Sequence, residues 1–315
     1  MQNVGAYIGN DERGIFMNCY LPEPMQARPA AYTTEDLWHA IHQRTILQAT
    51  AVLCDEAHDL HVELGCCRGV IPREEAALGI TSGETRDIAI LSRVGKPVCF
   101  HVTRFQPDGS VLLSRRSAQN EALDALLSQR RPGDIMPAVV TSLAPFGAFC
   151  DVGCGVPALL PLGDICVSHP QSPGDVLAEN QAIFAAIRAL DPAARRVSLS
   201  LKELLGTWQE NADRFARGQT VTGIVRSVKS YGAFIALTPN LAGLAEPTDG
   251  LQPGDAVSVY IKSIIPEKLK IKLCVIRNLG PAARGSQALQ YTKICGSVTS
   301  WRYGTESNAK VMTIF

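Results

Sequence analysis

The chain has 315 residues, of which 46% are hydrophobic, and it carries 30 basic and 30 acidic side chains. This length allows two or three domains, and the hydrophobic share excludes wholesale disorder. No run approaches the ~18 consecutive apolar residues that a membrane helix needs, and residues 1–10 show no signal-peptide pattern. We therefore expect a cytoplasmic protein that does not enter a membrane.

The charges are unevenly distributed along the chain. Residues 1–113 hold 9 Lys and Arg against 14 Asp and Glu, a net charge of −5, whereas residues 218–315 hold 11 against 5, a net charge of +6. A polyanion is attracted to the second region and repelled by the first. This asymmetry indicates that the two ends of the chain meet different partners.

The ten cysteines indicate neither a disulfide framework nor a metal site. Most lie in β-like runs where a small hydrophobic side chain is expected, as Cys99 does, and no secretory pattern favours disulfides. The best zinc candidates match no Cys-x-x-Cys spacing; they are Cys150, Cys154, Cys166 and His169. We expect no metal and no cofactor.

The first third of the chain contains a capped helix and five short runs with strand periodicity. Residues 1–33 contain prolines and no periodic pattern, so we interpret them as an N-terminal extension. Thr33 and Asp36 form the pattern of a capping box, which predicts the start of a helix. Together with the strand-like runs that follow, this helix makes residues 34–117 a unit. The five predicted strands are residues 46–54, 59–64, 68–72, 95–103 and 110–116.

Two further units repeat each other closely. Residues 118–129 and 201–215 have helical spacing, and they lead into residues 131–204 and 217–276, respectively. In these two units Phe146-Gly-Ala-Phe149 and Tyr231-Gly-Ala-Phe234 lie 85 residues apart, each after an alternating strand and before a Gly/Leu-rich run. Five short strands per unit predict a small closed barrel.

The predicted fold class is therefore mainly β, with three tandem five-stranded barrels joined by short helices. We call residues 34–117 unit one, residues 131–204 unit two and residues 217–276 unit three. Residues 277–315 form a C-terminal tail, in which residues 291–303 and 310–315 are interpreted as a short hairpin.

The aromatic-Gly-Ala-Phe element indicates a surface for stacking bases. Residues three apart in a regular strand point to opposite faces. We interpret the Gly as permitting a bulge, which would bring both rings to one side of the barrel. Two neighbouring rings on a barrel wall can stack on bases of any sequence, at about 1–3 kcal/mol per base.

Units two and three resemble the S1 domain, the OB-fold RNA-binding module of bacterial ribosomal protein S1 that also recurs in polynucleotide phosphorylase. The family pattern runs from a Gly-led strand through [FY]-G-A-F, a Gly-Leu-Leu turn and Gly-Asp-x-Val to Asp-x-x-x-x-Arg-[IV]-x-Leu-Ser-x-Lys. Unit two matches it with Phe146-Gly-Ala-Phe149, Leu159-Leu160, Gly163-Asp164 and the run from Asp191 to Lys202. The resemblance implies that the barrels are OB folds.

The resemblance also implies which side chains form an RNA surface. By match with the family motif they are the two aromatic residues and the polar residues of the last strand pair: Phe146, Phe149, Asp191 and Arg196 in unit two, and Tyr231, Phe234 and Lys270 in unit three. Lys272 alternates with Lys270 beside the rings, where phosphates would lie. The family often has His after Gly-Leu-Leu, where this chain has Pro161 and Glu246.

Unit one is acidic and lacks the aromatic-Gly-Ala-Phe element. It resembles the N-terminal repeats of ribosomal protein S1, which implies docking onto proteins of the 30S ribosomal subunit. The alternative is that unit one has decayed into a spacer.

Two functions of different classes remain open at this point. We find no carboxylate cluster, P-loop or activated nucleophile in the sequence, so we expect no enzyme. The first function is binding of single-stranded RNA, implied by the resemblance to be translation-related, with messenger RNA as the partner near the small ribosomal subunit. The second is a protein-interaction scaffold on the ribosome or the RNA-decay machinery with little RNA affinity, which Pro161, Glu246 and the zero net charge favour.

Overall fold

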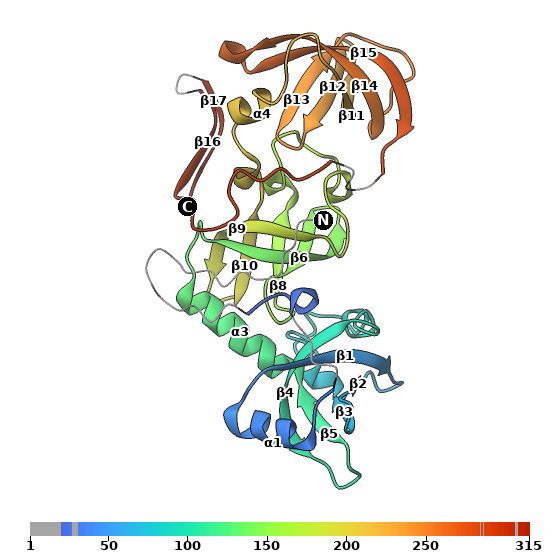
Figure 1. Cartoon of the computed structure of the whole chain (residues 1–315), viewed down its shortest axis with the longest axis vertical. Coiled ribbons are helices and arrows are strands. Elements are labelled where there is room, and N and C mark those ends of the chain that lie inside the picture. The colour runs from blue at the N-terminus through green and yellow to red at the C-terminus, as the bar shows by residue number, and fades with distance from the viewer. Residues whose placement is uncertain (1–19, 27–30, 284, 286, 306–307) are drawn as a thin grey trace.

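The computed structural model describes residues 20–26, 31–283, 285, 287–305 and 308–315. Three barrels follow one another in chain order along the longest axis of the molecule, with unit one at one end and unit three at the other (Figure 1). Residues 1–19 of the expected N-terminal extension lie outside the described residues. Among the helices of the described residues, none has the length and apolar character that crossing a membrane requires.

Each unit closes into a five-stranded barrel with the same strand order, in which the last strand pairs with both the third and the fourth. The strands of unit one are β1 (Leu47–Cys54), β2 (Leu60–Glu63), β3 (Arg68–Ile71), β4 (Pro97–Phe105) and β5 (Val111–Ser114). Those of unit two are β6 (Ile135–Ala144), β7 (Gly147–Asp151), β8 (Pro157–Pro161), β9 (Ala182–Asp191) and β10 (Arg196–Ser200). Those of unit three are β11 (Thr220–Lys229), β12 (Gly232–Thr238), β13 (Leu241–Ala245), β14 (Asp255–Ile265) and β15 (Lys270–Pro281). The predicted fold class is confirmed.

The barrels are filled by the alternating apolar residues of their strands. In β10, for example, Val197 and Leu199 point into the barrel, whereas Arg196 is exposed. Each unit has a hydrophobic core of its own, and the core of unit two also contains one face of the helix that precedes it. This alternation is the period-two pattern of a strand with one face toward water.

The helices are few and short. They are α1 (Thr34–Gln43), α2 (Ile88–Leu91), α3 (Arg115–Gln129) and α4 (Trp208–Ala212), and the 3-10 helices are η1 (Glu23–Met25), η2 (Arg73–Glu75), η3 (Leu162–Asp164), η4 (Pro173–Asp175), η5 (Lys202–Leu205) and η6 (Pro266–Lys268). The capping box of Thr33 and Asp36 is confirmed at the start of α1. The expected helix over 201–215 is wrong, because Gly206 has φ +82° and breaks it between η5 and α4.

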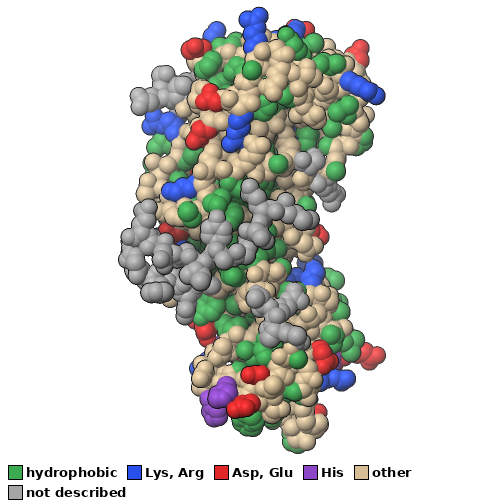
Figure 2. Space-filling model, viewed as in Figure 1, with side chains coloured by type: hydrophobic (Ala, Val, Ile, Leu, Met, Phe, Trp, Pro, Cys, Tyr) green, Lys and Arg blue, Asp and Glu red, His purple; other side chains and the backbone are tan. Residues whose placement is uncertain are grey.

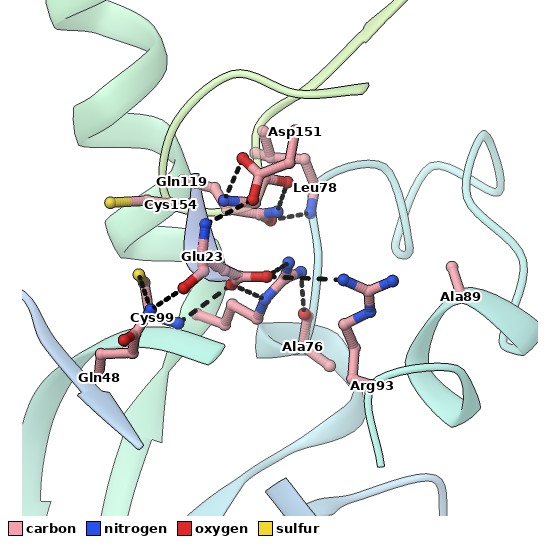
Figure 3. A network of polar contacts seen from close by, with 12 residues as sticks. Glu23, Gln48, Ala76, Leu78, Ala89, Arg93, Cys99, Gln119, Asp151 and Cys154 are labelled. Carbon is pink, nitrogen blue, oxygen red and sulfur yellow. Dashed lines mark hydrogen bonds and ion pairs between the residues drawn. The ribbon is translucent and has the colours of Figure 1, made fainter. Parts of the chain in front are cut away.

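A buried ionic cluster joins unit one to unit two (Figure 3). Glu23 of η1 is 1% exposed, and its carboxylate accepts hydrogen bonds from Nε and Nη2 of Arg115 at 2.8 and 2.9 Å and from the amide of Cys99 at 3.0 Å. Its own backbone amide donates to Asp151 of β7 at 2.7 Å. Burial, with a smaller contribution from Glu23, raises the pKa of Asp151 to about 7. The short segment 20–26 therefore connects both barrels.

Units two and three are joined by a buried amide and by the C-terminal tail. Asn240 accepts from the amide of Val167 at 3.1 Å and donates to the carbonyls of Lys202 and Gly206 at 2.7 and 2.9 Å. The tail contains the predicted hairpin as β16 (Ser300–Thr305) and β17 (Asn308–Ile314). Two of its aromatic residues, Trp301 and Tyr303, are buried in the core of unit three. Hydrogen bonds and packing thus hold consecutive barrels against each other.

Candidate nucleic-acid interface

In unit two, the two rings of the repeated element lie side by side on the outside of the barrel. Phe149 of β7 is 36% exposed and is flanked by the buried Ala148 and Cys150, and Phe146 in the preceding turn is 59% exposed. The ring centroids are 6.0 Å apart and the ring planes are nearly perpendicular. We call these two side chains the ring pair of unit two.

The ring pair of unit three, Tyr231 and Phe234, has nearly the same geometry. Tyr231 is 61% exposed in the turn before β12, and Phe234 lies half-buried on the outer face of that strand. Their centroids are 6.2 Å apart, again with perpendicular planes. The two units therefore present the same pair of rings to the surroundings.

The reason for the glycine differs from our interpretation. We expected it to form a bulge, but β7 pairs with β8 in unbroken register, and the irregularity lies on the neighbouring β6. A Cβ at Gly147 would lie 2.5 Å from the carbonyl oxygen of Leu160, and one at Gly232, where φ is +145°, would lie 2.2 Å from that of Ala245. The first ring reaches the outer face because it stands in the turn, and the glycine lets the adjacent strand pass closely.

The strand register shows which residues lie beside the second ring of each pair on the two neighbouring strands. In unit two, Phe149 is paired with Leu159, and Leu159 with Ser198. In unit three, Phe234 is paired with Leu244, and Leu244 with the exposed Lys272. Ser198 and Lys272 therefore occupy equivalent positions, and only unit three has a cation there.

The remaining predicted residues lie at the turn that leads into the last strand. Arg196 and Lys270 are equivalent, two residues before Ser198 and Lys272, and both are exposed. Asp191 is paired with Arg196 across the hairpin, and its carboxylate accepts from the amide of Ala194 at 2.9 Å. Asp191 thus caps the turn that presents Arg196.

The turn of unit two contacts other parts of the chain. Arg195 donates from Nη1 to Asp124 of α3 at 2.6 Å and from Nη2 to the side chain of Asn120 at 3.1 Å. Arg196 donates to Glu84 of unit one at 3.3 Å, with both side chains well exposed. Neither contact could be predicted from the sequence, because the partners are 71 to 112 residues apart.

Unit three has an ion pair on the same face. Glu246 follows β13, and its carboxylate accepts a hydrogen bond from Nζ of Lys262 at 2.7 Å. This hydrogen bond lowers the pKa of Glu246 and raises that of Lys262. The charge of Lys272 also lowers the pKa of Glu246, by less than the hydrogen bond from Lys262 does.

Unit one has a histidine at the position of the second ring. His61 of β2 is paired with Val70, and Val70 with Leu112, as Phe149 is with Leu159 and Ser198. The His61 side chain is largely buried, and its Nε2 lies 2.9 Å from a carboxylate oxygen of Asp55. That hydrogen bond is the main reason why the pKa of Asp55 is lowered. Unit one therefore has the strand position, but the ring at that position is not exposed.

The distribution of charge follows the sequence. In the view of Figure 2, Lys and Arg side chains are spread over the end formed by unit three, and acidic side chains gather with histidines at the end formed by unit one. In the part of the chain that the structure describes, no group of three or more His, Cys, Asp or Glu side chains could hold a metal ion.

Comparison with known proteins places the chain among S1-domain proteins. Residues 130–202 match the family model described as S1 RNA binding domain. Small ribosomal subunit protein bS1 of Leuconostoc lactis is 31% identical over 232 residues, which are 68% of this chain and 52% of the relative. The bS1 protein of Staphylococcus aureus (strain COL) is 30% identical over 225 residues, or 66% of this chain and 56% of the relative. The chain spans about half the length of these curated relatives.

Among solved structures, one that matches this chain is a multidomain protein with nucleic acid binding domains from Streptococcus pneumoniae TIGR4. It is 14% identical with a TM-score of 0.27, and the match covers 74% of this chain and 73% of that chain. The intact alpha subunit of aIF2 from Pyrococcus abyssi is 25% identical with a TM-score of 0.23, over 24% of this chain and 30% of that chain. On the family model and the sequence relatives, this chain is an S1 RNA-binding domain protein related to small ribosomal subunit protein bS1.

Proposed function

We propose that this protein binds single-stranded RNA through units two and three and catalyses no reaction on it. The observation that carries the proposal is the pair of exposed, adjacent rings at equivalent positions of two barrels. Aromatic side chains on an OB-type wall stack on unpaired bases, and nearby cations bind the phosphates. The residues proposed to do this are Phe146, Phe149, Asp191, Arg196, Tyr231, Phe234, Lys270 and Lys272.

The roles of these residues differ. The rings stack on bases, and because stacking uses the ring face rather than the base edge, little sequence preference is expected. Arg196, Lys270 and Lys272 contact phosphates, whereas Asp191 positions Arg196 through its turn. Each unit alone binds a few nucleotides with low affinity. Because the two units are joined, the first contact raises the effective concentration of the second.

The proposed role is translation-related and cytoplasmic. It is supported by the relatives, which are named small ribosomal subunit protein bS1. In this role units two and three hold messenger RNA near the small subunit, while unit one docks onto proteins of the 30S subunit. The acidic character of unit one and the burial of His61, at the position of the second ring, support a partner other than RNA for this unit.

The second candidate is an interaction scaffold with little RNA affinity of its own. Two residues on the outer faces favour it, because Pro161 and Glu246 stand where the family often has His. A titration separates the two candidates. A labelled unstructured RNA is titrated with the full chain, and fluorescence anisotropy is followed at about 50 and 200 mM salt. We expect saturable binding with a Kd in the micromolar range that weakens with salt, whereas the scaffold shows no saturable signal.

The proposed docking of unit one onto the 30S subunit needs a separate test. The full chain is sedimented with 30S subunits in the presence and absence of excess unstructured RNA. We expect co-sedimentation that persists under RNA competition, because unit one contacts protein. Complete loss under competition would show that the chain reaches the subunit only through RNA.

A further inference from the structure

On the outer face of unit two, the cations at the β9–β10 turn are already paired with carboxylates of the same chain. Arg196 donates to Glu84 and Arg195 donates to Asp124, at the distances given above. A phosphate oxygen would accept hydrogen bonds from these guanidinium groups in the same way as a carboxylate oxygen does. A phosphate that binds Nη2 of Arg196 therefore competes with Glu84 for it.

Glu84 belongs to unit one, and the loop that carries it is anchored on both sides of the junction. Within the loop, Ile80 is buried in the core of unit one. Just before it, the amide of Leu78 donates to the side chain of Gln119 on α3 at 2.8 Å, and Gln119 donates to the carbonyl of Gly155 in unit two at 2.5 Å. Figure 3 shows Leu78 and Gln119 beside the buried cluster of Glu23 and Asp151. The carboxylate is thus held near Arg196 by the fold, although the ion pair itself is exposed.

Unit three supplies its own carboxylate. Glu246 stands two residues after Leu244, the residue paired with both Phe234 and Lys272, and it holds Lys262 at 2.7 Å. Both faces with a ring pair therefore carry a carboxylate against a cation, one from a neighbouring unit and one from the same barrel.

We propose that Glu84 and Glu246 act as internal substitutes for RNA phosphates, and that RNA binds by displacing them. This inference rests on the proposed function and adds a regulation of the same site. Displacement returns a carboxylate to water, where it takes up a counterion, so the net release of ions on binding falls. Attraction to any polyanion is weakened, and stacking on the rings carries a larger share of the affinity. The device favours unpaired strands over duplex RNA, whose bases cannot reach the rings.

The test uses the full chain and the variants Glu84→Gln, Glu246→Gln and their double. The probes are a fluorescein-labelled unstructured RNA of about 20 nucleotides, which is long enough for two OB-type barrels, and a duplex of the same length. Kd is measured over a series of salt concentrations. Glu56→Gln is the matched control, because it removes the same charge from an exposed position in another loop of unit one.

We expect each test variant to bind the single strand about two- to fivefold more tightly at low salt, the range that loss of an exposed ion pair permits. The slope of log Kd against log salt should steepen by about 0.7 per displaced carboxylate. The double variant should also gain more affinity for the duplex than for the single strand. Glu56→Gln should leave the slope at its wild-type value.

The results separate the inference from the proposed function. If the wild type binds RNA and the test variants keep its affinity and slope, or gain no more than Glu56→Gln does, the inference is wrong and the proposed function stands. If neither the wild type nor any variant binds the single strand, the proposed function is wrong, and the inference fails with it.

Discussion

Replacing Glu23 should destabilise the junction between units one and two more than any single carboxylate change within unit one does. Glu23→Gln keeps the size of the side chain but removes its charge. The Arg115 guanidinium, 5% exposed, then loses a bidentate partner at 2.8 and 2.9 Å. Breaking a buried ion pair typically costs about 3–5 kcal/mol. Asp151 remains nearby as a second carboxylate, so we expect the lower end, a loss of about 3 kcal/mol in the free energy of unfolding.

The assay is urea denaturation of the full chain, followed by circular dichroism and by limited proteolysis of segment 20–26. Glu35→Gln is the matched control, because Glu35 is 86% exposed on α1 and pairs only loosely with His39 at 3.8 Å. It should change the free energy of unfolding by less than about 0.5 kcal/mol. Adding Arg115→Met to Glu23→Gln removes the unpaired charge and should restore part of the loss. A loss below about 1 kcal/mol for Glu23→Gln would refute the view that this pair holds the two barrels together.

Three further predictions concern single residues. Gly232→Ala places a Cβ 2.2 Å from the carbonyl oxygen of Ala245; we expect about 2–3 kcal/mol lower stability in thermal unfolding, whereas Gly163→Ala, with open space around it, should change little. Asn240→Ala removes two hydrogen bonds from unit three to unit two and a third to Gly206 in the segment between them. It should cost about 2–4 kcal/mol and speed hydrogen exchange at the amide of Val167; unchanged exchange would contradict this role. The raised pKa of Asp151, about 7, means that its contribution to stability is full below pH ~4 and is lost as the pH rises through 7. The stability advantage of the wild type over Asp151→Asn should therefore be larger at pH 5 than at pH 8, and a pH-independent difference would contradict it.

The barrels and the ring pairs could be predicted because their signals are local and repeated. The period-two alternation of apolar and polar residues predicted strands such as β10, and the recurrence of the aromatic-Gly-Ala-Phe element at an 85-residue spacing predicted two equivalent surfaces. The same local information gave the capping box of Thr33 and Asp36. Each of these features needs only a few neighbouring residues to be recognised.

Contacts between distant residues could not be predicted in this way. Glu23 lies in a segment without periodicity, and its partner Arg115 is 92 residues away. Glu84 and Arg196 are 112 residues apart, and neither stands in a pattern that would indicate a charge pair. The position of His61 was also not predicted. His61 occupies the strand position that holds a phenylalanine in the other two units, and only its pairing with Val70 in the strand register shows this. The close approach of β8 to Gly147 likewise depends on tertiary geometry.

The most direct test of the account replaces the rings of one unit at a time and measures RNA binding. The variants are Phe146→Ala with Phe149→Ala, and Tyr231→Ala with Phe234→Ala, in the full chain, with Leu53→Ala as a control for loss of an exposed apolar side chain in unit one. Stacking is worth about 1–3 kcal/mol per base, so each double replacement should weaken binding of an unstructured RNA at least about fivefold while the circular dichroism spectrum is retained. Affinity within about twofold of the wild type in both double variants would contradict RNA binding through the ring pairs.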